Sequence, residues 1–346
     1  MSAPLRVALV GYGFVGKVFH APLIQATPGL LLHTVVSRDA GKVHADWPDV
    51  RVVDDAHAAF ADPDVQIVVI ASPNDTHAAL AIAALAQGKH VVVDKPFTVT
   101  VQEARQVIDA ARGADRSVSV FQNRRWDADF LTLRRLIAEC AQGEVAEFHS
   151  HFDRYRPVVA DRWRERDQPG SGLWFDLGPH LLDQALQLFG MPDALLADIA
   201  MQREGARSAD YFHVQLRYPT RRVVLHAGSL VPAHGLRFAV HGTRASYVKH
   251  GMDAQEDALR SGSSPGQTGW GHDPQPGTLH IELQGETLKE TVESIPGDYR
   301  QYYMAMRDAI LRGGPAPVST RDALQVMTML EWAVESSVER REIACR

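Results

Sequence analysis

The first third of the chain alternates short, continuously apolar runs with segments of helical character. Unbroken hydrophobicity is typical of strands that are covered on both faces, as they are in parallel sheets. Helix signals separate these runs, including a capping box from Thr100 to Glu103. The apolar runs lie at residues 5–10, 30–36, 65–71, 90–94 and 117–121, and the helical segments at about 15–26, 55–60, 78–87 and from 100 onward. Strands that alternate with helices predict a doubly wound, parallel α/β sheet.

After residue 122 the pattern changes to alternating apolar and polar positions, which indicates strands exposed on one face. Few helices separate these segments, so they predict an open, mainly antiparallel sheet whose free face suits a subunit partner. The strands are expected at 145–152, 212–218, 223–227, 236–241 and 279–283, and helices at 128–139, 299–312 and 320–338.

These two patterns predict two domains. The first, at 1–122, is an N-terminal α/β domain, and the second, at 123–346, is a C-terminal α+β domain whose last helix is free to pack back on the first. The segment 251–278 is rich in glycine and proline and is long for a loop in a compact domain. Loops of that length are commonly lids, interface arms or disordered segments. The sequence leaves these roles open.

The first apolar run leads directly into Gly11-Tyr12-Gly13-Phe14-Val15-Gly16 and then into a helix. A G-x-G-x-x-G turn in this context is the dinucleotide-binding fingerprint of Rossmann folds. Gly11 permits the tight turn, Gly13 lets a pyrophosphate approach the backbone, and Gly16 lets the helix pack on the strand. The N–H groups of the first helical turn, at Phe14 and Val15, then favour phosphate. The alternative is a strand–turn–helix unit that binds nothing.

The end of the second strand bears on the choice of coenzyme. NAD-binding folds usually place an acidic residue there to hold the ribose 2′-hydroxyl. Here the strand ends in Ser37-Arg38, with Asp39 one place later and Lys42 nearby. A serine hydroxyl, a guanidinium and a further ammonium suit a 2′-phosphate. We therefore expect NADP to be preferred, with NAD as the alternative coenzyme. A surface turn without a ligand is the competing interpretation.

Loops at the carboxyl ends of parallel strands meet at the ligand crevice. Ser72-Pro73-Asn74, Lys95 and Gln122-Asn123 should therefore face the same site as the glycine turn. Lys95 ends a buried strand, where a solvated charge is not expected, and an ammonium there can stabilise negative charge on a substrate oxygen. A lysine that reaches solvent from a strand end explains the residue equally well.

One helix in the second half carries a further candidate pair. Asp176 and His180 are four residues apart and so share one helix face. Because Pro179 is best tolerated in a first helical turn, we expect the helix to start near Asp176, with Asp176 at or beside the N-cap. A histidine beside a carboxylate is a candidate general base. A capping aspartate and a structural histidine are the alternative.

Composition excludes several classes of protein. The 346 residues carry a net charge of −6 without a polybasic block, which argues against nucleic-acid binding. No apolar run approaches the ~20 residues of a membrane span. The first strand begins too close to Met1 for a signal peptide, and two cysteines without ligand spacing fit a reducing cytosol. His149 and His151 share a strand face, but no further ligand pattern surrounds them, so we expect no metal site.

Several segments together resemble the glucose–fructose oxidoreductase / inositol dehydrogenase (Gfo/Idh/MocA) family over essentially the whole chain. Asp94 stands before the Lys-Pro pair, where the family usually has glutamate. The segments that carry the resemblance are 11–16, 72–77, 88–96 and 172–183, and residues 121–127 and 150–157 are similar to the branch that includes NADP-dependent scyllo-inositol dehydrogenase.

The resemblance implies a catalytic set of Lys95, Asp176 and His180 drawn from both domains. His180 would take the hydroxyl proton, Lys95 would polarise the same oxygen, and Asp176 would orient or charge the pair. Arg154 and Arg164 are weaker candidates for substrate contact. The expected coenzyme contacts are Gly11, Gly13, Phe14, Val15, Gly16, Ser37, Arg38, Lys42, Ser72, Pro73, Asn74, His77 and Lys95.

The expected function is NADP-dependent hydride transfer between the nicotinamide and a polyol or sugar, with an inositol/inosose pair as the first candidate. The resemblance further implies a homodimer or homotetramer built through the open sheet. From the composition we expect a cytoplasmic protein without nucleic-acid or membrane partners. Two alternatives stay open: reduction of another carbonyl or an imine, and a nucleotide-binding regulator without turnover.

Overall fold

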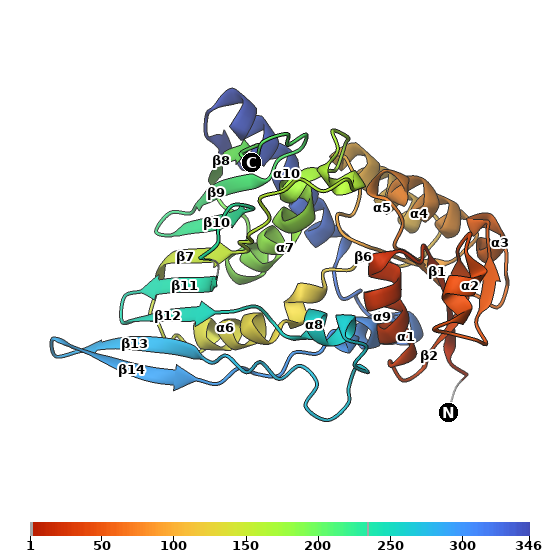
Figure 1. The fold of residues 1–346 in the computed structure, drawn as a ribbon, viewed down its shortest axis with the longest axis horizontal. Coiled ribbons are helices and arrows are strands. Elements are labelled where there is room, and N and C mark those ends of the chain that lie inside the picture. The colour runs from red at the N-terminus through yellow and green to blue at the C-terminus, as the bar shows by residue number, and fades with distance from the viewer. Residues whose placement is uncertain (1–2, 234) are drawn as a thin grey trace. The chain divides into compact units, whose positions relative to one another are not determined.

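The protein is described by a computed structural model over residues 3–233 and 235–346, and the chain forms two compact units (Figure 1). Each unit collects segments that are distant in the sequence. The first unit contains residues up to Asn123 together with Gln255–Trp270 and Asp298–Met327, and the second contains Arg124–Ala254, Gly271–Gly297 and Thr328–Arg346. Among the described residues, no helix has the length and apolarity that a membrane span requires.

The first unit is built on a sheet in the order β3-β2-β1-β4-β5-β6, in which every neighbouring pair is parallel. Its central strands are fully buried because both faces are covered, which confirms the interpretation of the unbroken apolar runs. The strands are β1 (Leu5–Val10), β2 (Leu30–Val36), β3 (Arg51–Val53), β4 (Ile67–Ile70), β5 (His90–Val93) and β6 (Val118–Val120). This is the predicted doubly wound sheet, with its topological switch between β1 and β4.

The helices of this unit follow the predicted alternation. The capping box is present, since Thr100 accepts from the Glu103 backbone while the Glu103 side chain accepts from the Thr100 N–H. The helical segments are η1 (Gly16–His20), α1 (Ala21–Gln25), α2 (Ala40–His44), α3 (Ala56–Phe60), η2 (Asn74–Thr76), α4 (His77–Ala86), α5 (Val101–Gly113), α8 (Gln255–Arg260) and α9 (Arg300–Arg312). The prediction lacked the short elements β3 and α2.

The second unit is built on a sheet in the order β14-β13-β12-β11-β7-β10-β9-β8-β15. Its pairs are antiparallel except for β7 and β10, so the predicted, mainly antiparallel sheet is confirmed. The strands are β7 (Val145–His151), β8 (Ala194–Ala200), β9 (Tyr211–Arg217), β10 (Arg222–Gly228), β11 (Leu236–Gly242), β12 (Ala245–His250), β13 (Gly277–Leu283), β14 (Glu286–Val292) and β15 (Ile343–Ala344).

The sequence prediction found five of these strands and missed β8, β12, β14 and β15. β14 is exposed at every position except Val292, so no alternating apolar pattern marks it. Its place is fixed instead by pairing along its whole length with β13. The remaining helical segments are η3 (Asn123–Trp126), α6 (Ala128–Ala138), η4 (Trp163–Glu165), α7 (Gly172–Phe189) and α10 (Thr320–Glu339), the last of which runs from the first unit into the second.

The two faces of the second sheet differ in chemistry. On one face, α7 packs against β9 and β10, and buried aromatic residues such as Phe148, Phe212 and Phe238 form the core. The opposite face carries histidines instead. They are His149 and His151 on β7, His213 on β9 and His226 on β10. These histidines are intermediate or exposed, so this face is solvated in the single chain.

The segment 251–278 contains an element that its composition did not predict. Its helix α8 lies in the first unit and packs against η1. Arg260, at the end of α8, stands over the Phe14 ring at 5.0 Å, and the Gln255 side chain accepts from the Tyr299 N–H. Glycine and proline therefore flank an ordered helix here rather than forming one long irregular loop.

Candidate active site

The glycine turn after β1 has the geometry that its three glycines suggested. Gly11 has φ +96°, a left-handed conformation that favours glycine, and a Cβ there would lie 2.7 Å from the Ala71 carbonyl oxygen. A Cβ on Gly16 would lie 2.1 Å from the Gly11 carbonyl oxygen. Gly13 differs, because a Cβ there would meet nothing within 4 Å. Gly11 and Gly16 are thus required by the fold, whereas Gly13 borders open space.

The helix that follows is continuous with the predicted 15–26 segment but changes pitch within it. Residues Gly16–His20 form a π-helical turn, in which the Ala21 N–H donates to the Gly16 carbonyl, and α1 continues from there. Pro22 has no N–H to donate, and a widened turn accommodates it. The Lys17 N–H donates to the Gly13 carbonyl at 2.9 Å. The N–H groups of Phe14 and Val15 precede this bond, and by helix geometry they are open to an anion.

The charged residues in the turn after β2 have different contacts. Asp39 caps α2 by accepting from the Lys42 N–H at 2.9 Å, so this carboxylate already has a structural partner. The Ser37 hydroxyl accepts from the Asp39 N–H at 3.1 Å, and Arg38 is exposed. The Lys42 ammonium donates to the Tyr12 carbonyl at 3.0 Å, which ties this turn to the glycine turn. The two predicted coenzyme turns are therefore neighbours.

The loop after β4 is fixed by a histidine that sequence analysis assigned to coenzyme contact. His77 is 1% exposed, and its ring nitrogens lie 2.9 Å from the Pro96 carbonyl and 3.0 Å from the Ser72 carbonyl. The imidazole thus bridges the loop after β4 to the loop after β5. The Ser72 and Thr76 hydroxyls bond at 2.6 Å within the first of these loops. Asn74 is buried beside them.

This bridge predicts a pH dependence of stability. Burial lowers the pKa of His77, although the charge of Asp94 and hydrogen bonds to the Pro96, Ser72 and Phe97 backbone raise it. The ordinary pKa of a histidine side chain is about 6.5, and His77 has this value only in the unfolded chain. The unfolded chain therefore binds more protons near and below pH 6.5, and the free energy of unfolding falls as the pH drops through that value, by at most about 1.4 kcal/mol per pH unit. Urea unfolding at pH 7.5 and 5.5 should show this loss.

The His77→Gln variant tests the source of that slope. The free energy of unfolding should differ less between pH 7.5 and pH 5.5 in this variant than in wild type. Part of the difference should remain, because burial also lowers the pKa values of His90, His213 and His226, which act in the same direction. Asp94 does not interfere, since a lowered carboxyl pKa acts only in acid below this window. An unchanged slope in His77→Gln would show that His77 titrates alike in the folded and unfolded chains.

Lys95 follows β5 and stands beside a buried charge cluster. Asp94 is 6% exposed, and its carboxylate lies 3.8 Å from His20 Nε2. His20 Nδ1 in turn bonds the Tyr303 hydroxyl at 2.5 Å. Burial alone would raise the pKa of Asp94, but its interactions with His20 and the charges of Lys95 and His77 together lower it. A fixed negative charge therefore lies next to Lys95 at the carboxyl edge of the sheet.

His20 and Tyr303 were missed by sequence analysis. His20 lies one turn past the glycine motif and Tyr303 lies on α9, nearly the whole chain away. The available signal was Asp94 itself, since a buried carboxylate requires partners. All loops predicted to face one site, including buried Gln122 and Asn123 after β6, do follow carboxyl ends of strands in this one parallel sheet.

The helix α7 corrects one prediction. It begins at Gly172 with Ser171 as the N-cap residue, so Asp176 is not at the N-cap and Pro179 lies inside the helix. The extra first turn is held by Trp174, which is 1% exposed, donates to the Leu330 carbonyl at 3.1 Å and packs edge-on against Phe212. Tertiary packing thus outweighs the cost of an internal proline. Asp176 and His180 remain four apart on one continuous helix.

A buried polar network anchors α7 one turn beyond His180. Asp183 accepts two bonds from the Arg125 guanidinium, at 2.8 and 2.6 Å. Gln184 donates to the Arg124 carbonyl and accepts from Arg237, which also lies 3.2 Å from Asp129. Removing one partner of such a buried pair is costly, so this network fixes the helix that carries Asp176 and His180. Arg125 and Asp183 lie in two segments that carry the family resemblance, 121–127 and 172–183, but nothing in the sequence pairs them.

Asp176 opens onto a cleft within the second unit. Arg164 Nε lies 3.5 Å and Arg154 Nη1 lies 4.0 Å from its carboxylate. His180 is 5% exposed on the same helix. The cleft is lined by the charged residues Arg154, Arg156, Arg162, Arg164, Arg203, Glu165, Asp176 and Asp210. Both predicted substrate arginines thus meet the predicted catalytic carboxylate, in a cleft with more arginines than carboxylates.

Comparisons with known proteins agree with this picture. Residues 5–122 match the oxidoreductase family NAD-binding Rossmann fold, and residues 134–345 match the oxidoreductase family C-terminal alpha/beta domain. The chain belongs to the Gfo/Idh/MocA family of oxidoreductases. The resemblance inferred from the motifs is therefore confirmed, and so is the expectation of an enzyme.

Individual relatives extend over nearly the whole chain. The uncharacterized oxidoreductase YdgJ of Escherichia coli is 52% identical, covering 98% of each chain. The scyllo-inositol 2-dehydrogenase (NADP(+)) IolW of Bacillus subtilis is 38% identical, covering 98% of this chain and 95% of its own. A solved structure of a Yersinia pestis protein described as an oxidoreductase has a TM-score of 0.96 and 49% identity, covering 100% of this chain and 98% of that one.

Proposed function

We propose that this chain is an NADP-dependent oxidoreductase that acts on a CH–OH group of a polyol or sugar, with an inositol/inosose pair as the first candidate. The observation that carries the proposal is the open space beside Gly13, at the start of a helix and at the switch point of a parallel sheet. The family membership and the name of the 38% identical relative IolW support the same coenzyme and substrate class.

The residues present fit a dinucleotide. The backbone at Gly13 leaves room for a pyrophosphate, and the N–H groups of Phe14 and Val15 would bind it. Ser37, Arg38 and Lys42 would hold the 2′-phosphate, while the carboxylate of Asp39 is engaged as a helix cap. Ser72, Pro73, Asn74 and Lys95 follow neighbouring strand ends, and His77 positions their loops. When bound, the coenzyme supplies a nicotinamide that accepts or donates hydride.

We assign the catalytic roles by chemistry. His180 accepts the proton of the reacting hydroxyl and returns it in the reverse direction. The Lys95 ammonium donates a hydrogen bond to the same oxygen and stabilises the charge that develops there. The carboxylate of Asp176 orients His180 and keeps the site's charge balanced. In this proposal, residues 1–122 bind the coenzyme and residues 123–346 supply the substrate side and, through the open sheet face, the contacts of a cytoplasmic homo-oligomer.

The coenzyme preference is tested at Arg38. Arg38 is exposed, so Arg38→Ala should leave the fold intact. We expect NADP to bind at least about tenfold more weakly, because a charge-assisted contact is worth about 1.5–3 kcal/mol, while NAD affinity stays unchanged. Tryptophan fluorescence titration with both coenzymes measures this. Equal losses for NADP and NAD would contradict a 2′-phosphate contact.

The substrate class is tested by following NADP reduction over inositols, aldoses and sugar acids. We expect turnover with at least one of the inositols. The arginine-rich cleft beside Asp176 favours a second candidate, a sugar acid whose carboxylate contacts Arg154 and Arg164. In that case Arg164→Gln should raise KM for the acid and leave KM for neutral sugars unchanged. Coenzyme binding without turnover of any compound would favour a nucleotide-binding regulator.

A further inference from the structure

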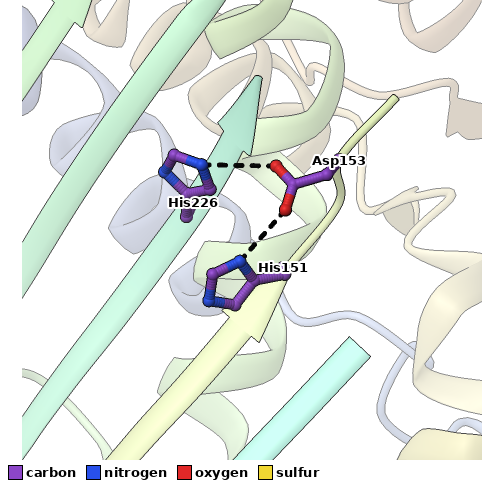
Figure 2. Close-up of side chains that lie close together, drawn as sticks. All are labelled: His151, Asp153 and His226. Carbon is purple, nitrogen blue, oxygen red and sulfur yellow. Dashed lines mark hydrogen bonds and ion pairs between the residues drawn. The ribbon is translucent and has the colours of Figure 1, made fainter. Parts of the chain in front are cut away.

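A cluster outside the proposed active site combines two imidazoles and a carboxylate. His151 and His226 both point toward the carboxylate of Asp153, as Figure 2 shows. His151 Nδ1 lies 3.1 Å from Asp153 Oδ2, and His226 Nε2 lies 3.3 Å from Asp153 Oδ1. One ligand atom from each residue lies within 4.8 Å of the others. The three side chains therefore converge on one point of the open face of the second sheet.

The strand register explains why these residues meet. β10 pairs with β7 in parallel, and in that register His226 stands directly beside His151. Asp153 follows the end of β7 on the same side, where its Oδ1 also accepts from the Gly228 N–H at 3.0 Å. Both strands and the chain beyond β7 are thus fixed by backbone hydrogen bonds. No spacing in the sequence marks this cluster, because His226 is far along the chain from the His149–His151 pair.

We propose that His151, Asp153 and His226 form a binding site for a divalent transition metal, with Zn²⁺ as the best-fitting ion. Two imidazole nitrogens and one carboxylate oxygen are an N₂O donor set that suits zinc, with water in the fourth position. Zinc bonds of about 2.0–2.1 Å in tetrahedral geometry separate neighbouring ligand atoms by about 3.4 Å. The His151 and His226 nitrogens lie 3.1 and 3.3 Å from two different oxygens of Asp153, close to this length, and a rotation of the carboxylate and the rings would bring one oxygen and both nitrogens around a single ion.

The cluster is partly sheltered from solvent. The side chains of His151, Asp153 and His226 are 18%, 9% and 17% exposed, so an ion can enter but is largely shielded from water. His226 Nδ1 is buried, which leaves Nε2 as the ligand atom.

The site is tested on the full, untagged chain after treatment with a chelator and dialysis. Isothermal titration with Zn²⁺ at pH 7.5 should give one ion per chain, and Co²⁺ should give the visible absorption of a four-coordinate N/O site. His226→Gln and His151→Gln should each weaken Zn²⁺ affinity by at least about 100-fold, because loss of a direct ligand exceeds the loss of an outer-shell partner. His241→Gln, on the same sheet face but outside the cluster, should bind as wild type.

Two further readouts separate a site from a change of fold. All variants should keep wild-type NADP affinity, and Zn²⁺ should raise the melting temperature of wild type and His241→Gln but not of His226→Gln. Zinc binding that both cluster variants retain would place the ion elsewhere and overturn the proposal. Binding by wild type only at millimolar Zn²⁺ would also overturn it and leave the cluster as a hydrogen-bonded His–Asp–His network.

Discussion

Lys95→Met is expected to lower turnover by about 10²- to 10³-fold, the usual effect of removing one donor to a developing oxyanion. Methionine keeps the length and apolar stem of lysine, so the loop after β5 should keep its packing. Asp94 retains its other partner, because His20 lies 3.8 Å from its carboxylate. We therefore expect NADP affinity to stay within a few-fold of wild type while kcat falls.

The measurement combines steady-state kinetics with a coenzyme titration on the same sample. Lys289→Met is the matched control, since Lys289 is exposed on β14 and outside the proposed site. It should behave as wild type in both experiments. Unchanged turnover in Lys95→Met would remove Lys95 from the catalytic set, and lost NADP affinity would reassign it to coenzyme binding alone.

The second large effect is expected from substitutions in the glycine turn. Gly16→Ala should destabilise the fold by several kcal/mol, because its Cβ would lie 2.1 Å from the Gly11 carbonyl oxygen, and neither backbone can easily move. Gly13→Ala adds the same methyl group into open space, so its stability should stay within about 1 kcal/mol of wild type. The same Gly13 methyl would occupy the approach of a pyrophosphate, and we expect NADP affinity to fall at least about tenfold.

This pair of variants separates a structural glycine from a ligand-binding one. Urea unfolding without coenzyme measures the first effect, and fluorescence titration with NADP measures the second. The proposed coenzyme site would be contradicted by a Gly13→Ala protein that is both stable and fully able to bind NADP. A Gly13→Ala protein that unfolds as easily as Gly16→Ala would show that the space at Gly13 is needed by the fold itself.

Most strands and helices of the first unit could be predicted because short stretches of sequence mark them. Buried parallel strands leave unbroken apolar runs, and caps such as Thr100 mark where helices begin. The glycine motif, Ser37-Arg38 and Lys95 could be placed at one sheet edge, because parallel strands bring their carboxyl ends together.

The features that the sequence did not predict depend on contacts between residues far apart in the chain. The early start of α7 depends on Trp174, which packs against residues distant in the chain. Asp94 lies beside His20 on η1, and His20 bonds Tyr303 on α9, so this cluster joins opposite ends of the chain. β14 has no apolar pattern, and the pairing of β7 with β10 that joins His151 to His226 is visible only in the folded sheet.

The central claim is that this chain moves hydride between NADP and a carbon that carries a hydroxyl group. The most direct test incubates the enzyme with NADP and the polyol or sugar found active in the screen, deuterated at the reacting carbon. Mass spectrometry of the coenzyme should find deuterium in the reduced nicotinamide, formed by wild type and only marginally by Lys95→Met. Reduced coenzyme without the label, or no reduction by any compound of the screen, would contradict the account.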